Sequence, residues 1–450
     1  MEDQKTVFKR LKDIVDKSSY QKELHNAADG EDVLIRTHFL NMQRKETWAY
    51  KVSASKLDCV GDVSNPNRIT YKLRALPYHG FLNNVVIQKF PVVKAKTGFE
   101  ICYTPNLGSN IISQAELQVN DLVWQTLDSE YFDDYNSKIS TEKNLDVNLG
   151  NVSQLTSWSK SLPAYTTLFS IPWFYTTHTS KMFPLYYCGK EDHIEHHLTL
   201  RRNLSDLIMI RSIDSGEMIP FDEACIEVES LTLPTPEMRG DYIFMSDMEC
   251  EHNRCNAQKL RSEVFDIDNV RSIDSDNIYS LNNTVNIKIK DMPFPVHTIH
   301  WKASNLKAKG LNYHSNYTTN FENHKLGESP IKMASLTCPQ GVIFKNVESL
   351  ISERIIPANN FAKVPSAGYG CWTNAVSPTD SLYPKAGLKL DEGELTIRLE
   401  DSFGNDTTNT DKFKVHARVV YSYRISFKDY PKTEAERNSK GIEIETSGDL

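Results

Sequence analysis

Three residues in the segment DHIEHH, residues 192–197, have the types and spacing of a metal site. His193, Glu195 and His197 alternate, so a β-strand here would place all three side chains on one face. Imidazole and carboxylate groups bind zinc, and three such ligands leave the open fourth position of a catalytic centre. Neighbours on one strand face are roughly 6–7 Å apart, however, and such ligands commonly need help from another segment. We therefore favour a polar strand face at a subunit contact, where histidine charge at about pH 6 would make assembly pH-sensitive.

Two further segments contain groups that could do chemistry. CEHNRC, residues 250–255, holds two thiols and a histidine, but zinc sites of this kind need a second pair at a matching distance, which the sequence lacks. SEYFDDYNS, residues 129–137, holds Asp133 and Asp134. A paired-acid mechanism needs two carboxyl groups about 5–10 Å apart across a cleft, and we interpret this segment as a solvated loop instead. The sequence thus predicts no bound metal ion and no cofactor.

The motifs of the commonest enzyme classes are absent from the sequence. It contains no glycine-rich phosphate-binding loop, no HExxH zinc-protease motif and no GxSxG nucleophile motif. We therefore predict no catalytic residues and a protein that is not an enzyme. Among the N-x-S/T sequons, those at Asn316 and Asn405 lie in polar stretches that are typical of exposed loops. These two asparagines are the candidate glycan acceptors.

Composition and charge predict a folded chain that does not bind nucleic acid directly. The 450 residues are 39% hydrophobic and 24% charged, as in globular proteins, and their number predicts two or three domains. The formal net charge is −8 and no block of lysine and arginine occurs, so we expect no direct binding of nucleic acid. The 8 cysteines are scattered, which favours reduced thiols. The N-terminus has no apolar signal core, and no run approaches about 18 apolar residues, so we expect synthesis in the cytoplasm.

The elements that must position these residues are mostly strands. One amphipathic helix is predicted in KTVFKRLKDIVDK, residues 5–17, and it defines an N-terminal arm, residues 1–24. Beyond it, apolar and polar residues alternate, most clearly in residues 115–119, 285–289, 395–399 and 415–427. Such alternation is typical of half-buried antiparallel strands. With Pro, Gly and Asn between short strands, the pattern predicts an all-β sandwich or jelly roll.

A weak internal repeat divides the chain in two. Residues 69–90 contain a strand, a proline turn and a second strand, and residues 283–304 repeat this order. Residues 234–261 hold two prolines and several acids with little alternation, which indicates a link between the halves. We therefore predict a first domain at residues 25–235, a linker at 236–262, a second domain at 263–430 and a polar C-terminal tail at 431–450.

Five segments, in the same order along the chain, resemble the double jelly-roll major capsid proteins of nucleocytoplasmic large DNA viruses, polinton-like viruses and virophages. NLGSNIISQAELQVNDLVWQ, residues 106–125, is similar to a strand pair of that family, and residues 165–200 are similar to its stretch with a Pro-aromatic-aromatic turn and Phe-Pro-Leu. Residues 283–304 place Trp301 at the family's tryptophan position. The other similar segments are residues 348–376 and 415–427. One departure is YPKAGLKLD, residues 383–391, where the family usually has a PsGtcNfSr element.

The resemblance implies two tandem eight-stranded antiparallel jelly rolls with a short N-terminal helical arm. It also implies a structural major capsid protein, whose homotrimers form pseudo-hexagonal capsomers that tile the icosahedral shell of a double-stranded DNA virus. The implied partners are neighbouring capsomers, minor capsid and penton proteins, and proteins associated with an internal membrane. The implied location is the virion, with assembly in the cytoplasm of the host cell.

Two other functions fit the sequence. A β-sandwich lectin or carbohydrate-active enzyme would need a groove lined with aromatic side chains, and the tryptophans that could supply them are Trp124, Trp158, Trp173, Trp301 and Trp372. A scaffold protein of the same fold, which is shed before the particle matures, is the other alternative. Its absence from mature particles would separate it from a capsid protein.

Overall fold

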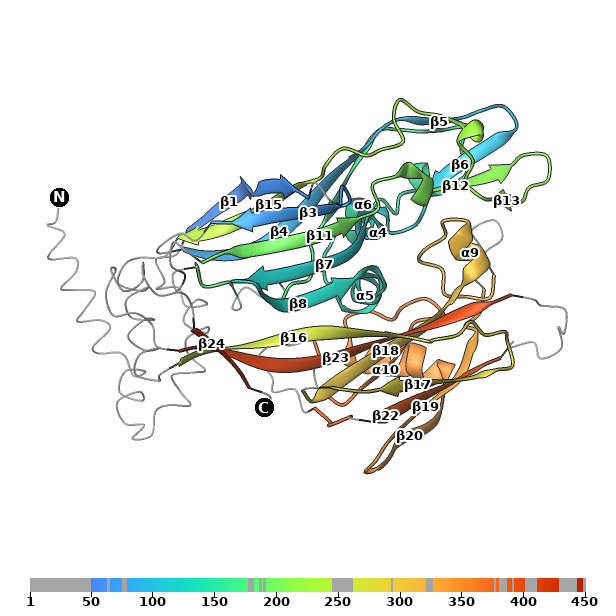
Figure 1. The fold of residues 1–450 in the computed structure, drawn as a ribbon. Helices are drawn as coiled ribbons and strands as arrows, with labels where there is room; N and C mark the ends of the chain where they lie inside the picture. The colour runs from blue at the N-terminus through green and yellow to red at the C-terminus, as the bar shows by residue number, and fades with distance from the viewer. Residues whose placement is uncertain are drawn as a thin grey trace, which may run out of the picture.

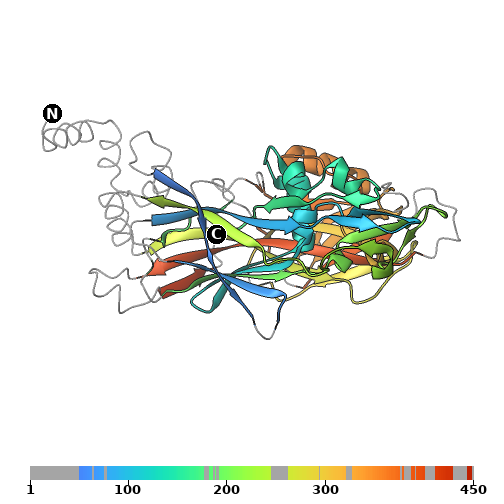
Figure 2. The same cartoon turned by 90° about the horizontal axis from the view of Figure 1, so that it is seen from above.

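The structure of the chain is a computed structural model. It describes residues 50–62, 65–74, 79–176, 182–185, 188, 192–244, 262–292, 294–320, 327–375, 378–379, 387–390, 392–400, 411–428 and 443–447. Figure 1 shows two β-sandwiches side by side, which we call domain 1, residues 50–244, and domain 2, residues 262–428. Seen from above in Figure 2, the strands of both domains run along the long direction of the molecule.

Domain 1 contains two main antiparallel sheets. The first has the order β1 (Tyr50–Lys56), β15 (Glu237–Phe244), β4 (His79–Phe90) and β10 (Tyr165–Phe169). The second has the order β2 (Asp58–Gly61), β3 (Arg68–Leu73), β11 (Ile194–Leu200), β7 (Ile112–Val119) and β8 (Leu122–Asp128). With β2 set aside, the strands counted along the chain stand as 1-8-3-6 in the first sheet and 2-7-4-5 in the second.

Domain 2 repeats this connectivity. Its first sheet has the order β16 (Ser262–Asp274), β23 (Phe413–Lys428), β18 (Val296–Asn305) and β21 (Gly370–Thr373), and β24 (Glu443–Ser447) pairs with β23. Its second sheet has the order β17 (Thr284–Ile289), β22 (Gly393–Leu399), β19 (Ile331–Cys338) and β20 (Gly341–Glu348). Counted along the chain, the orders are again 1-8-3-6 and 2-7-4-5. Two antiparallel sandwiches of 8 main strands each confirm the prediction of an all-β chain with tandem jelly rolls.

The alternation in the sequence becomes the two faces of each sheet. Exposed and buried residues alternate along β17, and buried residues occupy every second position of β11 and β22. The inward side chains form one core in each domain, around the fully buried Trp173 and Trp301 respectively. One strand departs from the rule, because all 10 residues of β18 are buried. Domain 1 covers the face of β18 that the alternation assigns to solvent.

Short sheets and helices fill the connections. Two small sheets extend one end of domain 1, at the upper right of Figure 1. Their strands are β5 (Val93–Ala95), β9 (Ser161–Leu162) and β14 (Ile226–Glu227), and β6 (Phe99–Tyr103), β12 (Ile208–Ser212) and β13 (Met218–Ile219). The helical segments are α4 (Leu107–Asn110), α5 (Ser129–Asp134), η2 (Tyr135–Ile139), α6 (Leu145–Leu149), α7 (Ser153–Thr156), η5 (Leu204–Asp206), η6 (Glu223–Cys225), α9 (Leu306–Gly310), η8 (Ile351–Ile355) and α10 (Ile356–Asn360).

The predicted boundaries need two corrections. Residues 237–244, assigned to the linker, form β15, which pairs with both β1 and β4. Residues 443–447, assigned to the polar tail, form β24. Charged residues within both segments, and two prolines beside β15, hid the strands from a search for apolar alternation. The predicted N-terminal arm and residues 245–261 of the predicted linker lie outside the described residues. Within the described part of the chain, no helix is long and apolar enough to cross a membrane.

Candidate functional site at the interface between the two domains

The two domains meet along β8 and α5 on one side and β16, β18 and β23 on the other (Figure 1). The Thr126 amide donates a hydrogen bond to Asn269 Oδ1 at 3.0 Å, and Tyr423 Oη donates to the Trp124 carbonyl. Ile267 and Tyr423 of domain 2 also belong to the apolar core of domain 1. The contact is therefore a continuation of a core and not a loose junction.

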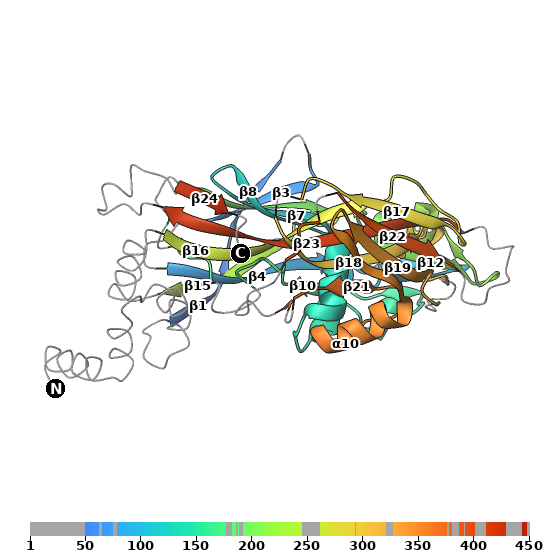
Figure 3. The ribbon, with the colours of Figure 1, turned by 90° about the horizontal axis from the view of Figure 1, so that it is seen from below.

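The helical segment formed by α5 and η2 carries most of the polar contacts. It begins where β8 ends, because Asp128 accepts a hydrogen bond from the Tyr131 amide at 2.9 Å and caps the helix. Phe132 anchors it to its own domain by an edge-on contact with Phe169 of β10, with 5.1 Å between ring centroids. Figure 3 shows this segment beside α10 of domain 2. The Lys363 amide, just after α10, donates to a carbonyl of η2 at 3.0 Å.

A buried cluster of charges joins this segment to β18. The Asp134 carboxylate lies 2.8 Å from Lys138 Nζ and 2.9 Å from Lys302 Nζ, and the three side chains are at most 1% exposed. Lys138 Nζ also lies 3.0 Å from His300 Nδ1, so this imidazole nitrogen accepts a hydrogen bond from the ammonium group. Asp134 and Lys138 belong to domain 1, whereas Lys302 and His300 belong to domain 2. The cluster therefore crosses the interface.

The pKa values in this cluster follow from burial and pairing. Burial alone would raise the pKa of Asp134, but the ammonium groups of Lys138 and Lys302 outweigh it and hold this pKa below its ordinary range. Burial, reinforced by Lys138, lowers the pKa of His300 well below its ordinary value. At neutral pH the carboxylate is charged and the imidazole is neutral. A shift of one domain along the other would leave these charges buried without their partners, so the cluster favours one relative position of the domains.

Asp133 is held mainly by neutral donors. Its carboxylate accepts hydrogen bonds from Asn106 Nδ2 at 3.0 Å, Ser315 Oγ at 3.0 Å and Tyr317 Oη at 2.8 Å. Burial raises the pKa of Asp133 in spite of these donors. The interpretation of this segment as a solvated loop is wrong, because Asp133 and Asp134 are at most 1% exposed. Their burial depends on partners from domain 2, which lie far away in the sequence.

A second cluster surrounds Arg418 of β23. The guanidinium group lies 2.8 Å from Asp128, 3.4 Å from Glu130 and 2.8 Å from Asp274. Lys309 Nζ lies 3.0 Å from Glu130 on the same side. Asp128, the residue that caps α5, thus also pairs with domain 2. These carboxylates are engaged by cations, which suits a domain contact better than proton transfer to a substrate.

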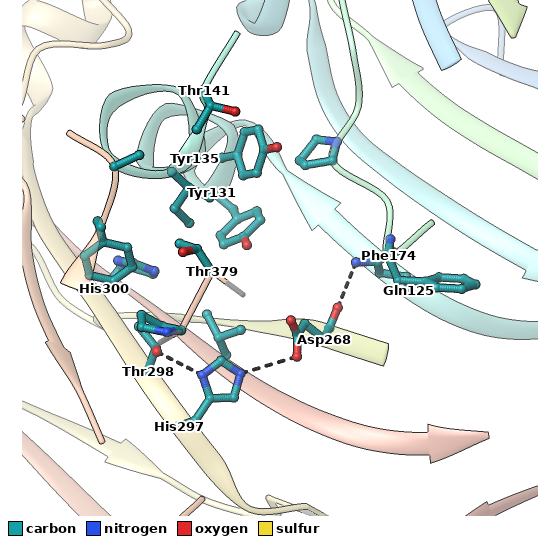
Figure 4. Close-up of a pocket in the computed structure, with 16 residues that line it drawn as sticks. Gln125, Tyr131, Tyr135, Thr141, Phe174, Asp268, His297, Thr298, His300 and Thr379 are labelled. Atoms are coloured by element: carbon teal, nitrogen blue, oxygen red, sulfur yellow. Dashed lines mark hydrogen bonds and ion pairs between the residues drawn. The ribbon is translucent and has the colours of Figure 1, made fainter. Parts of the chain in front are cut away.

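A small cavity lies within the same interface (Figure 4). Its volume is about 170 Å³, and side chains of both domains line it. Gln125 Nε2 donates to the Asp268 carbonyl at 2.8 Å, and His297 Nε2 lies 3.5 Å from Asp268 Oδ1. His297 Nδ1 shares a hydrogen bond with Thr298 Oγ1 at 2.9 Å. Pockets for small molecules usually enclose roughly 300–1,000 Å³, so this space suits a few water molecules and not an organic ligand.

Several solved structures of known proteins are similar to the structure of this chain. No family model matches it, and no curated protein matches it by sequence. The Faustovirus major capsid protein superposes with a TM-score of 0.65 at 8% identity, over 88% of this chain and 98% of that chain. The PBCV-1 virus capsid gives a TM-score of 0.63 at 13% identity, over 85% and 95%. The Sputnik virophage gives 0.54 at 9% identity, over 90% and 89%. The chain has the double jelly-roll fold of these capsid proteins.

In this double jelly roll, the residues predicted as weak zinc candidates lie at β11. Glu195 and His197 share one face, with 3.3 Å between Glu195 Oε2 and His197 Nε2. Lys72 Nζ pairs with the other carboxylate oxygen of Glu195 at 2.9 Å, and Thr70 Oγ1 lies 2.8 Å from His197 Nδ1. His193 precedes the strand and is exposed. Among the described residues, no three His, Cys, Asp or Glu side chains are grouped to hold a metal ion.

Of the two candidate glycan acceptors, Asn316 lies among the described residues and Asn405 does not. Asn316 is 1% exposed, and its Oδ1 accepts a hydrogen bond from the Thr318 amide at 3.0 Å while its Nδ2 donates to the Asn320 carbonyl at 2.9 Å. The expectation of an exposed loop is therefore wrong at Asn316, because this polar stretch satisfies its own hydrogen bonds inside the double jelly roll. Asn405 and the CEHNRC segment lie outside the described residues.

The five tryptophans that the structure describes do not form the aromatic groove that a lectin would need. Trp124, Trp173 and Trp301 are at most 2% exposed and belong to the two cores. Trp158 lies under the Arg211 guanidinium, 5.0 Å from ring centroid to cation. Trp372 packs against Phe344, with 5.8 Å between centroids. These side chains serve packing in the double jelly roll.

The sequence reasoning missed the cations of the interface. Lys302 and Arg418 lie on the polar sides of β18 and β23, which alternation assigns to solvent. A signal was present, because these polar sides also carry His300 and His416, and imidazole is a less frequent choice for an open surface than lysine or glutamate.

Removing the Tyr317 hydroxyl tests the neutral part of this interface. Tyr317→Phe leaves the buried Asp133 carboxyl with one donor fewer, so we expect the free energy of unfolding to fall by about 1–2 kcal/mol. The shift of the urea midpoint measures it. Tyr165→Phe is the matched control, since the Tyr165 hydroxyl donates to the Val147 carbonyl at the surface and its loss should cost less than about 0.5 kcal/mol. Equal effects of the two changes would contradict a specific role for Tyr317.

Proposed function

We propose that this chain is a structural major capsid protein, three copies of which form a pseudo-hexagonal capsomer in the shell of an icosahedral double-stranded DNA virus. The fold likeness to capsid proteins, which extends over 85% to 90% of the chain, supports this role. The observation that carries it is the buried charged interface between two jelly rolls of identical connectivity. A rigid pair of similar units supplies six similar lobes when three chains associate.

A fixed angle between the domains matters for this role. Each capsomer must meet its neighbours at defined positions, and a hinge between the jelly rolls would spread those positions. Contacts between unlike domains of different copies are heterologous, and they close into a ring when the rotation allows it. The proposal involves no catalytic step, and it places the protein in the virion after assembly in the host cytoplasm.

The partners belong to the same proposal. Neighbouring capsomers, minor capsid and penton proteins, and proteins of an internal membrane would contact the capsomer. The net charge of −8 supports protein partners over bare DNA, because phosphate binding needs a basic face. Tight DNA binding that weakens steeply with salt would contradict this part.

Electron microscopy of the purified chain in negative stain tests the proposal. We expect particles with threefold symmetry and a hexagonal outline, and light scattering should give about three times the chain mass of 51.4 kDa. Single two-lobed particles at every concentration would overturn the capsomer. Detection of the chain in mature particles separates a capsid protein from a scaffold that is shed.

A further inference from the structure

The two jelly rolls carry corresponding helical segments that are covered to different degrees. In each domain the fifth main strand leads into one: β8 into α5 and η2, and β20 into η8 and α10. β8 ends at Asp128, which Ser129 follows, and β20 ends at Glu348, which Ser349 follows. This shared acid-serine junction allows the two segments to be compared residue by residue.

In domain 1 the outward positions of the segment touch domain 2. These are Glu130, Tyr131, Asp134, Tyr135 and Lys138, which contact Lys309, His300 or Lys302 or line the interface cavity. Their counterparts, counted from the junction, are Leu350, Ile351, Arg354, Ile355 and Ala358. All five counterparts are exposed, whereas Ser352, the counterpart of the inward Phe132, is buried. Domain 2 thus presents, uncovered, the surface that domain 1 buries within the chain.

Four of the five uncovered positions are apolar, and Arg354 is the exception. Leu350 is 63% exposed, Ile355 49% and Ile351 38%. Val342 of β20, at 59%, and Val364 after α10, at 45%, are also among the most exposed large apolar residues of the described chain. Several such side chains on one strand and the helix that follows it mark a contact surface.

The face of domain 2 that the α5 and η2 segment covers also has a counterpart in domain 1. In domain 2 the segment of domain 1 covers β18, the third main strand, whose outward residues are polar and buried. In domain 1 the third main strand is β4, whose outward residues Leu82, Val85 and Ile87 are partly buried and are followed on the same face by the exposed Lys89. Leu168 of β10 pairs with Ile87 and adds to the same face. The covered face is polar and its covering segment is charged, whereas the uncovered face and the uncovered segment are mainly aliphatic, apart from Lys89 and Arg354.

We infer that the surface of β20, η8 and α10 in one copy docks on the outer face of β4 and β10 in a second copy, in the arrangement that the two domains adopt within one chain. This inference rests on the proposed capsomer and names the surfaces that build it. At the rim, Asp128 pairs with Arg418 of the eighth strand within the chain. The acid at the matching junction is Glu348, and the eighth strand of domain 1 carries the exposed Arg239, which pairs with Glu237 of its own strand. Arg239 lies opposite Val85 in the sheet, beside the receiving face.

Because the docking surface and the receiving surface belong to different domains, the contact is head-to-tail. Each copy uses its domain 2 on one neighbour and its domain 1 on the other, and these contacts close into a ring of three when each contact rotates the next copy by one third of a turn. Three copies then contain the same type of contact six times, alternately within and between chains.

Two variants with one surface damaged in each test this inference. Leu350→Glu with Ile355→Glu damages the docking surface, and Val85→Glu with Ile87→Glu damages the receiving face. Buried aliphatic anchors dominate such contacts, so we expect each variant alone to need a roughly 100-fold higher concentration for half-assembly into trimers. Val60→Glu with Ile278→Glu is the matched control, because these side chains are 49% and 55% exposed away from both surfaces. Sedimentation velocity measures the assembly, and circular dichroism checks that each variant is folded.

Mixing the two damaged variants gives the sharpest result. The intact docking surface of one fits the intact receiving face of the other, so the mixture should form dimers and no rings. Wild-type trimers together with undiminished trimers of the docking variant would overturn the assigned surfaces and leave the capsomer standing. Wild-type chains that stay monomeric throughout would overturn the proposed function itself, and this inference with it.

Discussion

Asp134→Asn is expected to lower the free energy of unfolding by about 3–5 kcal/mol, because it leaves two buried ammonium groups without a counter-charge. Lys138 Nζ and Lys302 Nζ lie 2.8 Å and 2.9 Å from the carboxylate, and the side chains are at most 1% exposed. Neither lysine can turn to water without moving the helical segment away from β18. Urea-induced unfolding at about pH 7.5 measures the loss.

A surface ion pair provides the control for this change. Asp58 lies 2.7 Å from Arg74, and the two side chains are 57% and 71% exposed. Asp58→Asn removes the same type of interaction where water replaces it, so the urea midpoint should move far less than it does for Asp134→Asn. If the two substitutions cost the same, the buried cluster would not fix the domains as we describe.

Acidification is expected to destabilise the protein before its carboxylates are protonated. Burial lowers the pKa of His196 from 6.5 to about 3 and that of His314 from 6.5 to about 4, and burial also lowers the pKa of His300 well below its ordinary value. As the pH falls below 6.5, the unfolded chain protonates these imidazoles while the folded chain keeps them neutral. The free energy of unfolding therefore falls with the pH, by about 1.4 kcal/mol per pH unit for each histidine. Asp134, with its depressed pKa, adds a loss only at lower pH, where the unfolded carboxyl takes up a proton.

Urea unfolding at a series of values from about pH 8 to about pH 5 measures this dependence. The three histidines together should give a slope of up to about 4 kcal/mol per pH unit in the acidic part of that range. His300→Gln removes one of them, so its slope should be smaller by about one proton. His193→Gln, at an exposed position, should leave the slope unchanged. Stability that stays level over the whole series would show that the folded and unfolded chains protonate these imidazoles alike, and so would contradict the lowered pKa values.

The half-buried strands could be predicted because each one shows an alternation of apolar and polar residues within its own sequence. Residues 285–289 and 395–399 alternate in sequence, and they form β17 and β22 with buried residues at every second position. The repeated strand-turn-strand order at residues 69–90 and 283–304 likewise corresponds to β3 with β4 and β17 with β18. In these segments one face meets a core and the other meets water, so local pattern and fold agree.

The interface could not be predicted in the same way, because its polar residues are buried by partners distant in the sequence. Lys302 occupies a position that alternation assigns to water, and only the arrival of Asp134 from the other domain changes its surroundings. Asn316 was misread for a similar reason, since its hydrogen bonds are made inside the fold. The sequence around a charged or amide side chain does not show whether that side chain will bind water or distant polar groups of the protein.

The charged side chains of the domain interface also matter while the chain is being synthesised. Domain 1 leaves the ribosome first, and its helical segment then waits for strands that are not yet synthesised. Its waiting surface carries the ionisable side chains Glu130, Asp134 and Lys138, which water hydrates well. An apolar surface exposed for the same interval would attract other unfinished chains. The charged part of the interface therefore stays hydrated until domain 2 covers it, whereas the apolar part that receives Ile267 and Tyr423 becomes covered only then.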